Sequence, residues 1–210
     1  MRFIQAWSYK CAYCLAQQLN ENHEKRGVYY YGFQVVIGAV VKGIMLVLAA
    51  LLVGALIPTI AVMLFFVSLR GIAGGYHMDT YDKCMAVSLA MFVLGGIIVE
   101  YSHMYWPYSH VLVLVVLTFA FGLYSVAKWA PRDTPNKPIK SPERIKKFKT
   151  LSIIHIFIWI ALELFLLHSN LKMYALAGCI GILLATFMIS PAGYRFFDTI
   201  SGKMDNVKKR

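Results

Sequence analysis

The polar segment from Arg70 to Cys84 contains the two residue types that a cysteine nucleophile requires. It reads RGIAGGYHMDTYDKC and separates two long apolar segments of the chain. Cys84 carries a thiol and His77 an imidazole, and a thiolate with an adjacent base attacks carbonyl carbon atoms. Because polar groups are costly next to a bilayer, a cluster of this kind in an apolar chain indicates a function.

The spacing of His77 and Cys84 restricts how they can cooperate. On one unbroken helix the two residues would lie about 10 Å apart along the axis. Direct proton transfer needs a separation of roughly 3 Å. Residues 77–84 must therefore turn back on themselves if the pair acts together. Gly74 and Gly75 are suited to break the preceding helix, and Cys84 is predicted at the N-terminus of the next helix, where an anion is stabilised.

Asp79 and Asp82 suggest a different chemistry in the same segment. A pair of carboxylates can bind Mg²⁺ together with a pyrophosphate substrate, as a lipid-modifying prenyl transferase would require. Such an enzyme needs a second acidic cluster, and the other polar segment, residues 128–150, holds only Asp133 and Glu143. The sequence therefore favours the thiol chemistry over the metal-dependent transfer.

Arg70 has three predicted roles that the sequence leaves open. Its guanidinium can neutralise a substrate carboxylate or steady the local fold. It can also act as a positive anchor at the cytoplasmic face of the membrane. A non-enzymatic carrier, exporter or scaffold, in which Arg70, His77 and Lys42 line a path, is the main alternative to an enzyme.

The composition predicts the kind of scaffold that holds these residues. Of the 210 residues 59% are hydrophobic and only 15% are charged, and the mean hydropathy is +0.61. Soluble domains contain about 45–50% apolar residues. We therefore predict an all-α, polytopic integral membrane bundle that forms a single domain over residues 1–210.

The apolar segments predict about six membrane spans, since a helix needs about 20 residues to cross the bilayer. An amphipathic N-terminal segment, residues 1–30, precedes them. Its helix, residues 3–18, is expected either to lie on the membrane surface or to pack on the bundle. The predicted spans are residues 33–55, 58–76, 85–103, 111–127, 151–167 and 174–189. The apolar stripe of the N-terminal helix comprises Phe3, Ile4, Trp7, Cys11, Cys14 and Leu15.

The basic residues predict the orientation in the membrane. The formal net charge is +11, with eight Lys or Arg in the basic, proline-rich loop 128–150 and five after Pro191. Cytoplasmic loops of membrane proteins are enriched in these residues. We therefore expect a multi-pass protein of the cell membrane with both termini and the 70–84 loop in the cytoplasm. The charge favours anionic lipid over nucleic acid as a partner.

Four cysteines, Cys11, Cys14, Cys84 and Cys179, fit no disulfide framework. Cys11 and Cys14 form a lone C-x-x-C without the second pair of ligands that a zinc site needs. We therefore expect no metal. Residues 1–30 contain no apolar core of signal-sequence length, so the first span is expected to act as an uncleaved targeting signal.

The polar segment and the basic loop together resemble the AgrB family, the accessory gene regulator B membrane peptidases of Gram-positive quorum sensing. Chain length and the multi-span layout correspond as well, so the resemblance covers nearly the whole chain. The matching positions are Arg70, Gly71, Gly74, Gly75, His77, Cys84 and the proline-rich stretch 130–139.

The resemblance implies a cysteine endopeptidase that cleaves an amphipathic AgrD-like propeptide near its C-terminal side. Cys84 would be the nucleophile and His77 the base, with Arg70, Gly74 and Gly75 building the site. The peptide would remain on Cys84 as a thioester, and a thiol or hydroxyl of the peptide would then close a thiolactone or lactone ring. The resemblance implies no metal or organic cofactor, and it makes a homodimer plausible.

Overall fold

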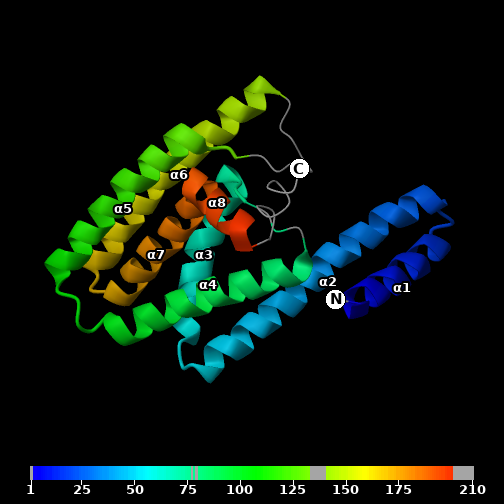
Figure 1. The fold of residues 1–210 in the computed structure, drawn as a ribbon, viewed down its shortest axis with the longest axis horizontal. Coiled ribbons are helices and arrows are strands. Elements are labelled where there is room, and N and C mark those ends of the chain that lie inside the picture. Colours follow the sequence, from blue (N-terminus) through cyan, green and yellow to red (C-terminus); the bar gives the residue numbers. More distant parts are fainter. Residues whose placement is uncertain (1, 77, 79, 133–140, 201–210) are drawn as a thin grey trace. The chain divides into compact units, whose positions relative to one another are not determined.

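The structure is a computed structural model that describes residues 2–76, 78, 80–132 and 141–200. Within these residues the chain forms eight helices and no β-strand (Figure 1). The predicted all-α fold is therefore confirmed. The helices are α1 (Arg2–Gln18), α2 (His23–Leu52), α3 (Leu56–Ala73), α4 (Tyr81–Ser102), α5 (Tyr108–Trp129), α6 (Pro142–His168), α7 (Lys172–Ile189) and α8 (Pro191–Ile200).

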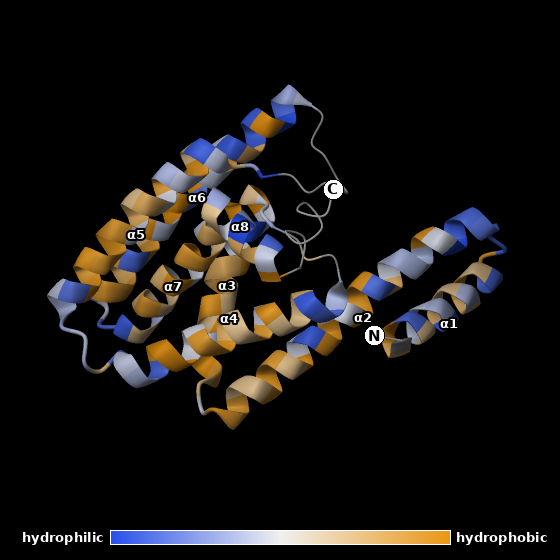
Figure 2. Cartoon of the chain, in the orientation of Figure 1, coloured by the Kyte–Doolittle hydropathy of each residue, from blue (hydrophilic) through white to orange (hydrophobic). Residues whose placement is uncertain are grey.

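Six of these helices, α2 to α7, are long and apolar enough to cross a membrane. Hydrophobic residues run along each of them in Figure 2. The predicted break between the first two spans occurs at Gly54, whose φ of 68° is readily available to glycine. There the Tyr101 hydroxyl donates a hydrogen bond to the Val53 carbonyl oxygen at 3.0 Å. The chain thus has the composition of a multi-pass membrane protein.

The described chain divides into two compact units, Met1–Ala49 and Ala50–Arg210. The first contains α1 and most of α2, which begins at His23, so the predicted N-terminal segment 1–30 includes the first turns of a spanning helix. The N-terminal helix itself was predicted, but of the positions that it buries only Ile4 belongs to the predicted stripe. Those positions recur every fourth residue, whereas Phe3 and Trp7 of the predicted stripe are 62% and 54% exposed. The buried positions are Ile4, Ser8, Ala12 and Ala16.

The second unit is organised around α7. This helix contacts α3, α4, α5, α6 and α8, and eleven of its eighteen residues are buried. Small residues allow the close approach, as is usual between membrane helices. A Cβ atom at Gly181, for example, would lie 2.7 Å from both Phe65 Cβ and the Val62 carbonyl oxygen. The contact between α3 and α7 therefore fixes the position of the end of α3, where the polar segment begins.

The short helix α8 was not among the predicted elements. Its start carries a clear local signal, because Ser190 accepts a hydrogen bond from the Gly193 N–H at 3.0 Å and Pro191 follows directly. A serine N-cap followed by proline at the first helical position favours a helix start. Gly193 and Phe197 form its buried face.

Candidate functional site

The end of α3 is held by the side chain of Arg70. Its guanidinium donates one hydrogen bond to the Gly74 carbonyl oxygen at 3.0 Å and another to the Tyr76 carbonyl oxygen. The Gly74 N–H in turn donates to the Arg70 carbonyl oxygen at 3.1 Å and closes the helix. Two donors of one planar group therefore define the path of the chain as it leaves the helix. Of the three roles predicted for Arg70, this geometry supports the one that steadies the local fold.

Gly74 and Gly75 adopt backbone conformations that other residues avoid, with φ values of 72° and 130°. Both positions are also crowded. A Cβ atom at Gly74 would overlap the Arg132 carbonyl oxygen, and one at Gly75 would overlap the Arg70 guanidinium and lie 3.1 Å from the Met188 carbonyl oxygen. Glycine is therefore required at both positions for two separate reasons.

The basic loop begins against this glycine turn. The Arg132 N–H donates to the Ala73 carbonyl oxygen at 2.9 Å, and the Gly75 N–H donates to the Arg132 carbonyl oxygen at 3.1 Å. These bonds form a parallel bridge between Gly74 and Arg132. The Tyr76 N–H completes the set by donating to Met188 at the end of α7, at 3.0 Å. The glycine turn is thus hydrogen-bonded to Arg70 of α3, to Arg132 of the basic loop and to Met188 of α7.

Cys84 lies in the first turn of α4 and is half-buried. Thr80 is the N-cap of this helix, and its side chain accepts a hydrogen bond from the Lys83 N–H at 3.4 Å. The Cys84 N–H donates to the Thr80 carbonyl oxygen at 3.0 Å, and Ser88 donates to the Cys84 carbonyl oxygen at 2.7 Å. The predicted position of Cys84 at a helix N-terminus is therefore found.

Arg70 lies in the last turn of α3, and the chain runs from there through the glycine turn to Cys84 in the first turn of α4. The end of α3, the glycine turn and the start of α4 are therefore close together along the chain. We call this cluster, formed by Arg70, Gly74, Gly75, Tyr76 and Cys84, the candidate site.

Two residues of the sequence prediction, His77 and Asp79, lie outside the described residues. Arg70, Gly74, Gly75 and Cys84 lie within them; the first three contact one another, and Cys84 lies in the first turn of α4. Asp82 is exposed in the first turn of α4.

Sequence reasoning missed several residues that contact the candidate site. The described residues between α3 and α4 are 74–76, 78 and 80, which is a shorter loop than the predicted 70–84, since the two helices include both ends of that range. Tyr76 is 4% exposed, and its hydroxyl donates to Asp198 at 3.0 Å. The Arg132 guanidinium lies 4.6 Å from the centre of the Tyr194 ring. An aromatic residue directly after two glycines was the one local signal for Tyr76.

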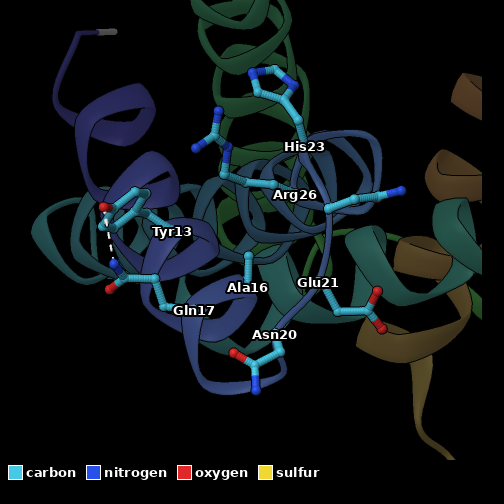
Figure 3. A pocket seen from close by; sticks show the side chains of 8 residues that line it. Tyr13, Ala16, Gln17, Asn20, Glu21, His23 and Arg26 are labelled. Atoms are coloured by element: carbon cyan, nitrogen blue, oxygen red, sulfur yellow. Dashed lines mark hydrogen bonds between the residues drawn. The ribbon is translucent and has the colours of Figure 1, made fainter.

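Two concave regions are lined by residues that do not belong to the candidate site. A pocket of about 630 Å³ follows the turn between α1 and α2, where Gln17 donates to the Tyr13 hydroxyl at 3.0 Å (Figure 3). An apolar groove of about 610 Å³ lies along α3 and α6 and contains the Ser68 and His155 pair, 3.2 Å apart. Neither contains a cysteine, and among the described residues no group of three His, Cys, Asp or Glu is arranged to hold a metal.

Comparison with known proteins gives one consistent result. A match to the accessory gene regulator B family covers residues 8–189. A protein of Listeria innocua serovar 6a described as AgrB-like is 30% identical over 165 residues, which is 79% of this chain and 76% of the relative. A protein of Clostridium perfringens strain SM101, also described as AgrB-like, is 26% identical over 160 residues, 75% of each chain.

No solved structure matches this chain. The family match includes every residue of the candidate site and both polar segments of the sequence. The chain therefore belongs to the accessory gene regulator B family.

Proposed function

We propose that the chain is a membrane cysteine endopeptidase that cleaves an AgrD-like propeptide near its C-terminal side and supports closure of the product into a ring. Membership of the accessory gene regulator B family supports a role in processing a quorum-sensing peptide. The specific chemistry is our inference from the candidate site.

The observation that carries the proposal is the position of Cys84. Cys84 lies in the first turn of α4, a few residues after the glycine turn, where two backbone carbonyl groups set the position of Arg70. The N-terminal end of a helix stabilises negative charge that develops during a reaction. Cys179, by contrast, is buried within the bundle, in the body of α7 rather than at its N-terminus.

The proposed reaction has two acyl-transfer steps. In the first, His77, the proposed base, takes the proton of the Cys84 thiol, and Cys84 Sγ bonds to the carbonyl carbon of the scissile peptide. The C–N bond then breaks, and the leaving amine takes that proton from His77. In the second, a thiol or hydroxyl of the bound peptide gives its proton to His77 and attacks the thioester carbon. The bond to Cys84 Sγ then breaks, and the sulfur regains the proton from His77. A thioester retains the acyl-transfer potential that ring closure requires, so no cofactor is needed.

Co-expression with the small open reading frame that neighbours the gene tests this proposal. We expect Cys84→Ser to give a folded protein that no longer cleaves the propeptide, because a serine hydroxyl is a poor nucleophile without a base matched to it. Asp82→Asn is the matched control, since Asp82 is an exposed carboxylate in the same helical turn, and it should retain cleavage.

Two results would count against the peptidase. Normal processing by Cys84→Ser would exclude Cys84 as the nucleophile. An equal loss of cleavage in Asp82→Asn and Asp79→Asn would favour the metal-dependent transferase instead. Export of an uncut peptide by the wild-type chain would favour the carrier.

A further inference from the structure

The C-terminal helix α8 contacts the candidate site with one face. Tyr76 is stacked on the Phe197 ring with a centroid separation of 5.3 Å, and the Tyr194 ring meets it edge-on at 5.2 Å. Its hydroxyl donates a hydrogen bond to Asp198 at 3.0 Å. Three residues of one short helix therefore surround a single aromatic side chain of the glycine turn.

The backbone of the same tyrosine contacts the other parts of the candidate site. Its carbonyl oxygen accepts a hydrogen bond from the Arg70 guanidinium, and its N–H donates to the Met188 carbonyl oxygen at 3.0 Å. Tyr76 is thus held by its side chain on α8 and by its backbone on α3 and α7. A movement of its ring would displace the carbonyl group that orients Arg70, at the beginning of the segment that leads to Cys84 in the first turn of α4.

A simple membrane anchor would not need this arrangement. Phe196 and Ile200 of α8 are exposed at 52% and 47%, and such residues suffice to hold an amphipathic helix at an interface. Asp198 instead accepts a hydrogen bond from Tyr76 of the candidate site. The Arg132 guanidinium of the basic loop lies over the Tyr194 ring, 4.6 Å from its centre. The inward face of α8 is therefore built around the glycine turn.

We propose that Asp198 is a positioning residue of the candidate site, and that α8 sets the position of Arg70 relative to Cys84 through Tyr76. The effect on catalysis rests on the proposed peptidase function. The mechanical link does not, because it can be measured on the thiol alone.

The test uses the full-length chain in lipid nanodiscs with Cys11, Cys14 and Cys179 changed to Ser, so that Cys84 is the one remaining thiol. The first measurement is the rate at which N-ethylmaleimide alkylates Cys84, and the second is the kcat and KM of propeptide cleavage. The variants are Tyr76→Phe, which keeps the stacked ring and removes the hydroxyl, and Asp198→Ala.

Tyr101→Phe is the matched control for loss of a hydroxyl. It also removes a tyrosine hydrogen bond of 3.0 Å, to the Val53 carbonyl oxygen, but at the opposite end of α4. Asp198→Asn is the conservative variant, because its amide oxygen can still accept the Tyr76 hydroxyl proton.

We expect Tyr76→Phe and Asp198→Ala to slow alkylation and to lower kcat by about fivefold to tenfold, with KM within about twofold of the parent. The double variant should lose no more than either single variant, since both remove the same bond. Asp198→Asn should restore most of the rate that Asp198→Ala loses.

The proposal is overturned if both variants match Tyr101→Phe in alkylation rate, if their losses multiply in the double variant, or if only KM changes. Slower alkylation in a chain that cleaves no propeptide would retain the mechanical link and reject the peptidase. Unchanged alkylation in a chain that cleaves by Cys84 would do the reverse.

Discussion

At the scale of single residues, Gly75 is a position where the candidate site tolerates little change. Its φ of 130° disfavours any side chain, and the guanidinium of Arg70 occupies the space that a Cβ atom would need. The glycine and the arginine are therefore a pair, in which the absence of one side chain makes room for the other.

The Gly75→Ala variant is expected to lose about a hundredfold in propeptide cleavage, since a displacement of about 1 Å at a catalytic site costs that much. The free energy of unfolding should also fall by roughly 1–3 kcal/mol because of the backbone strain. Steady-state kinetics and thermal unfolding measure the two effects. Gly43→Ala, at a position with no atom within 4 Å of the new Cβ, should be close to the parent in both, and a similar loss there would contradict the steric argument.

The Arg70→Lys variant keeps the charge and removes the planar group that reaches two carbonyl oxygens. An ammonium group is a compact donor that cannot reproduce this fork. We expect kcat to fall about tenfold, with the membrane-inserted protein still well folded. Full activity in Arg70→Lys would show that charge alone matters, and would support the role in which Arg70 only anchors the membrane face.

At the scale of elements, the end of α3 depends on how closely α3 packs on α7. Gly181 of α7 lies against the backbone of α3, and it is among the residues that allow this approach. Because α3 carries Arg70 and α7 ends near Met188, both partners of the glycine turn move if the two helices separate. The packing of α3 on α7 in the middle of the bundle thus sets the positions of Arg70 and Met188 at the ends of the two helices.

Gly181→Ala is therefore expected to lower the melting temperature and to lower cleavage. The added Cβ would lie 2.7 Å from Phe65 Cβ and from the Val62 carbonyl oxygen, and overpacking of this kind costs roughly 1–3 kcal/mol. Thermal unfolding in nanodiscs measures it, with Gly32→Ala, an open position on α2, as the control. An unchanged melting temperature would mean that α3 and α7 are not in contact as described.

The sequence predicted the long elements well and the short ones poorly, for physical reasons. Uninterrupted apolar segments are a strong signal, so the span that begins near Pro58 and the break at Gly54 were both found. Helix α8 has only ten residues and follows α7 almost directly, so the residues after Pro191 were read as a basic segment and not as a helix. The contact between Gly74 and Arg132 joins residues far apart in the chain, and a local sequence pattern cannot predict a pairing of that kind.

At the scale of the whole molecule, the distribution of basic residues predicts which end of the bundle faces the cytoplasm. The first turns of α6 expose Arg144, Lys146 and Lys147, whereas the turn between α4 and α5 contains no Lys or Arg at residues 104–109. By the positive-inside rule we propose that the α6 start and the candidate site face the cytoplasm. This basic surface would also attract anionic lipid or an acidic peptide tail.

Cysteine accessibility tests this orientation in intact cells. In a chain without its other exposed cysteines, the Tyr105→Cys variant should react with a membrane-impermeant maleimide, because Tyr105 is 84% exposed in the turn after α4. The Lys146→Cys variant should react only after the cells are permeabilised. Labelling of Lys146→Cys in intact cells would reverse the proposed topology.

The central claim is that Cys84 bonds covalently to the peptide during cleavage. Intact-protein mass spectrometry of rapidly quenched mixtures of the chain and the propeptide tests it most directly. The account predicts a transient mass increase equal to the N-terminal product less one water, located at Cys84 by fragmentation and released by hydroxylamine. Continued cleavage with no adduct at Cys84, or with the adduct on another residue, would contradict it.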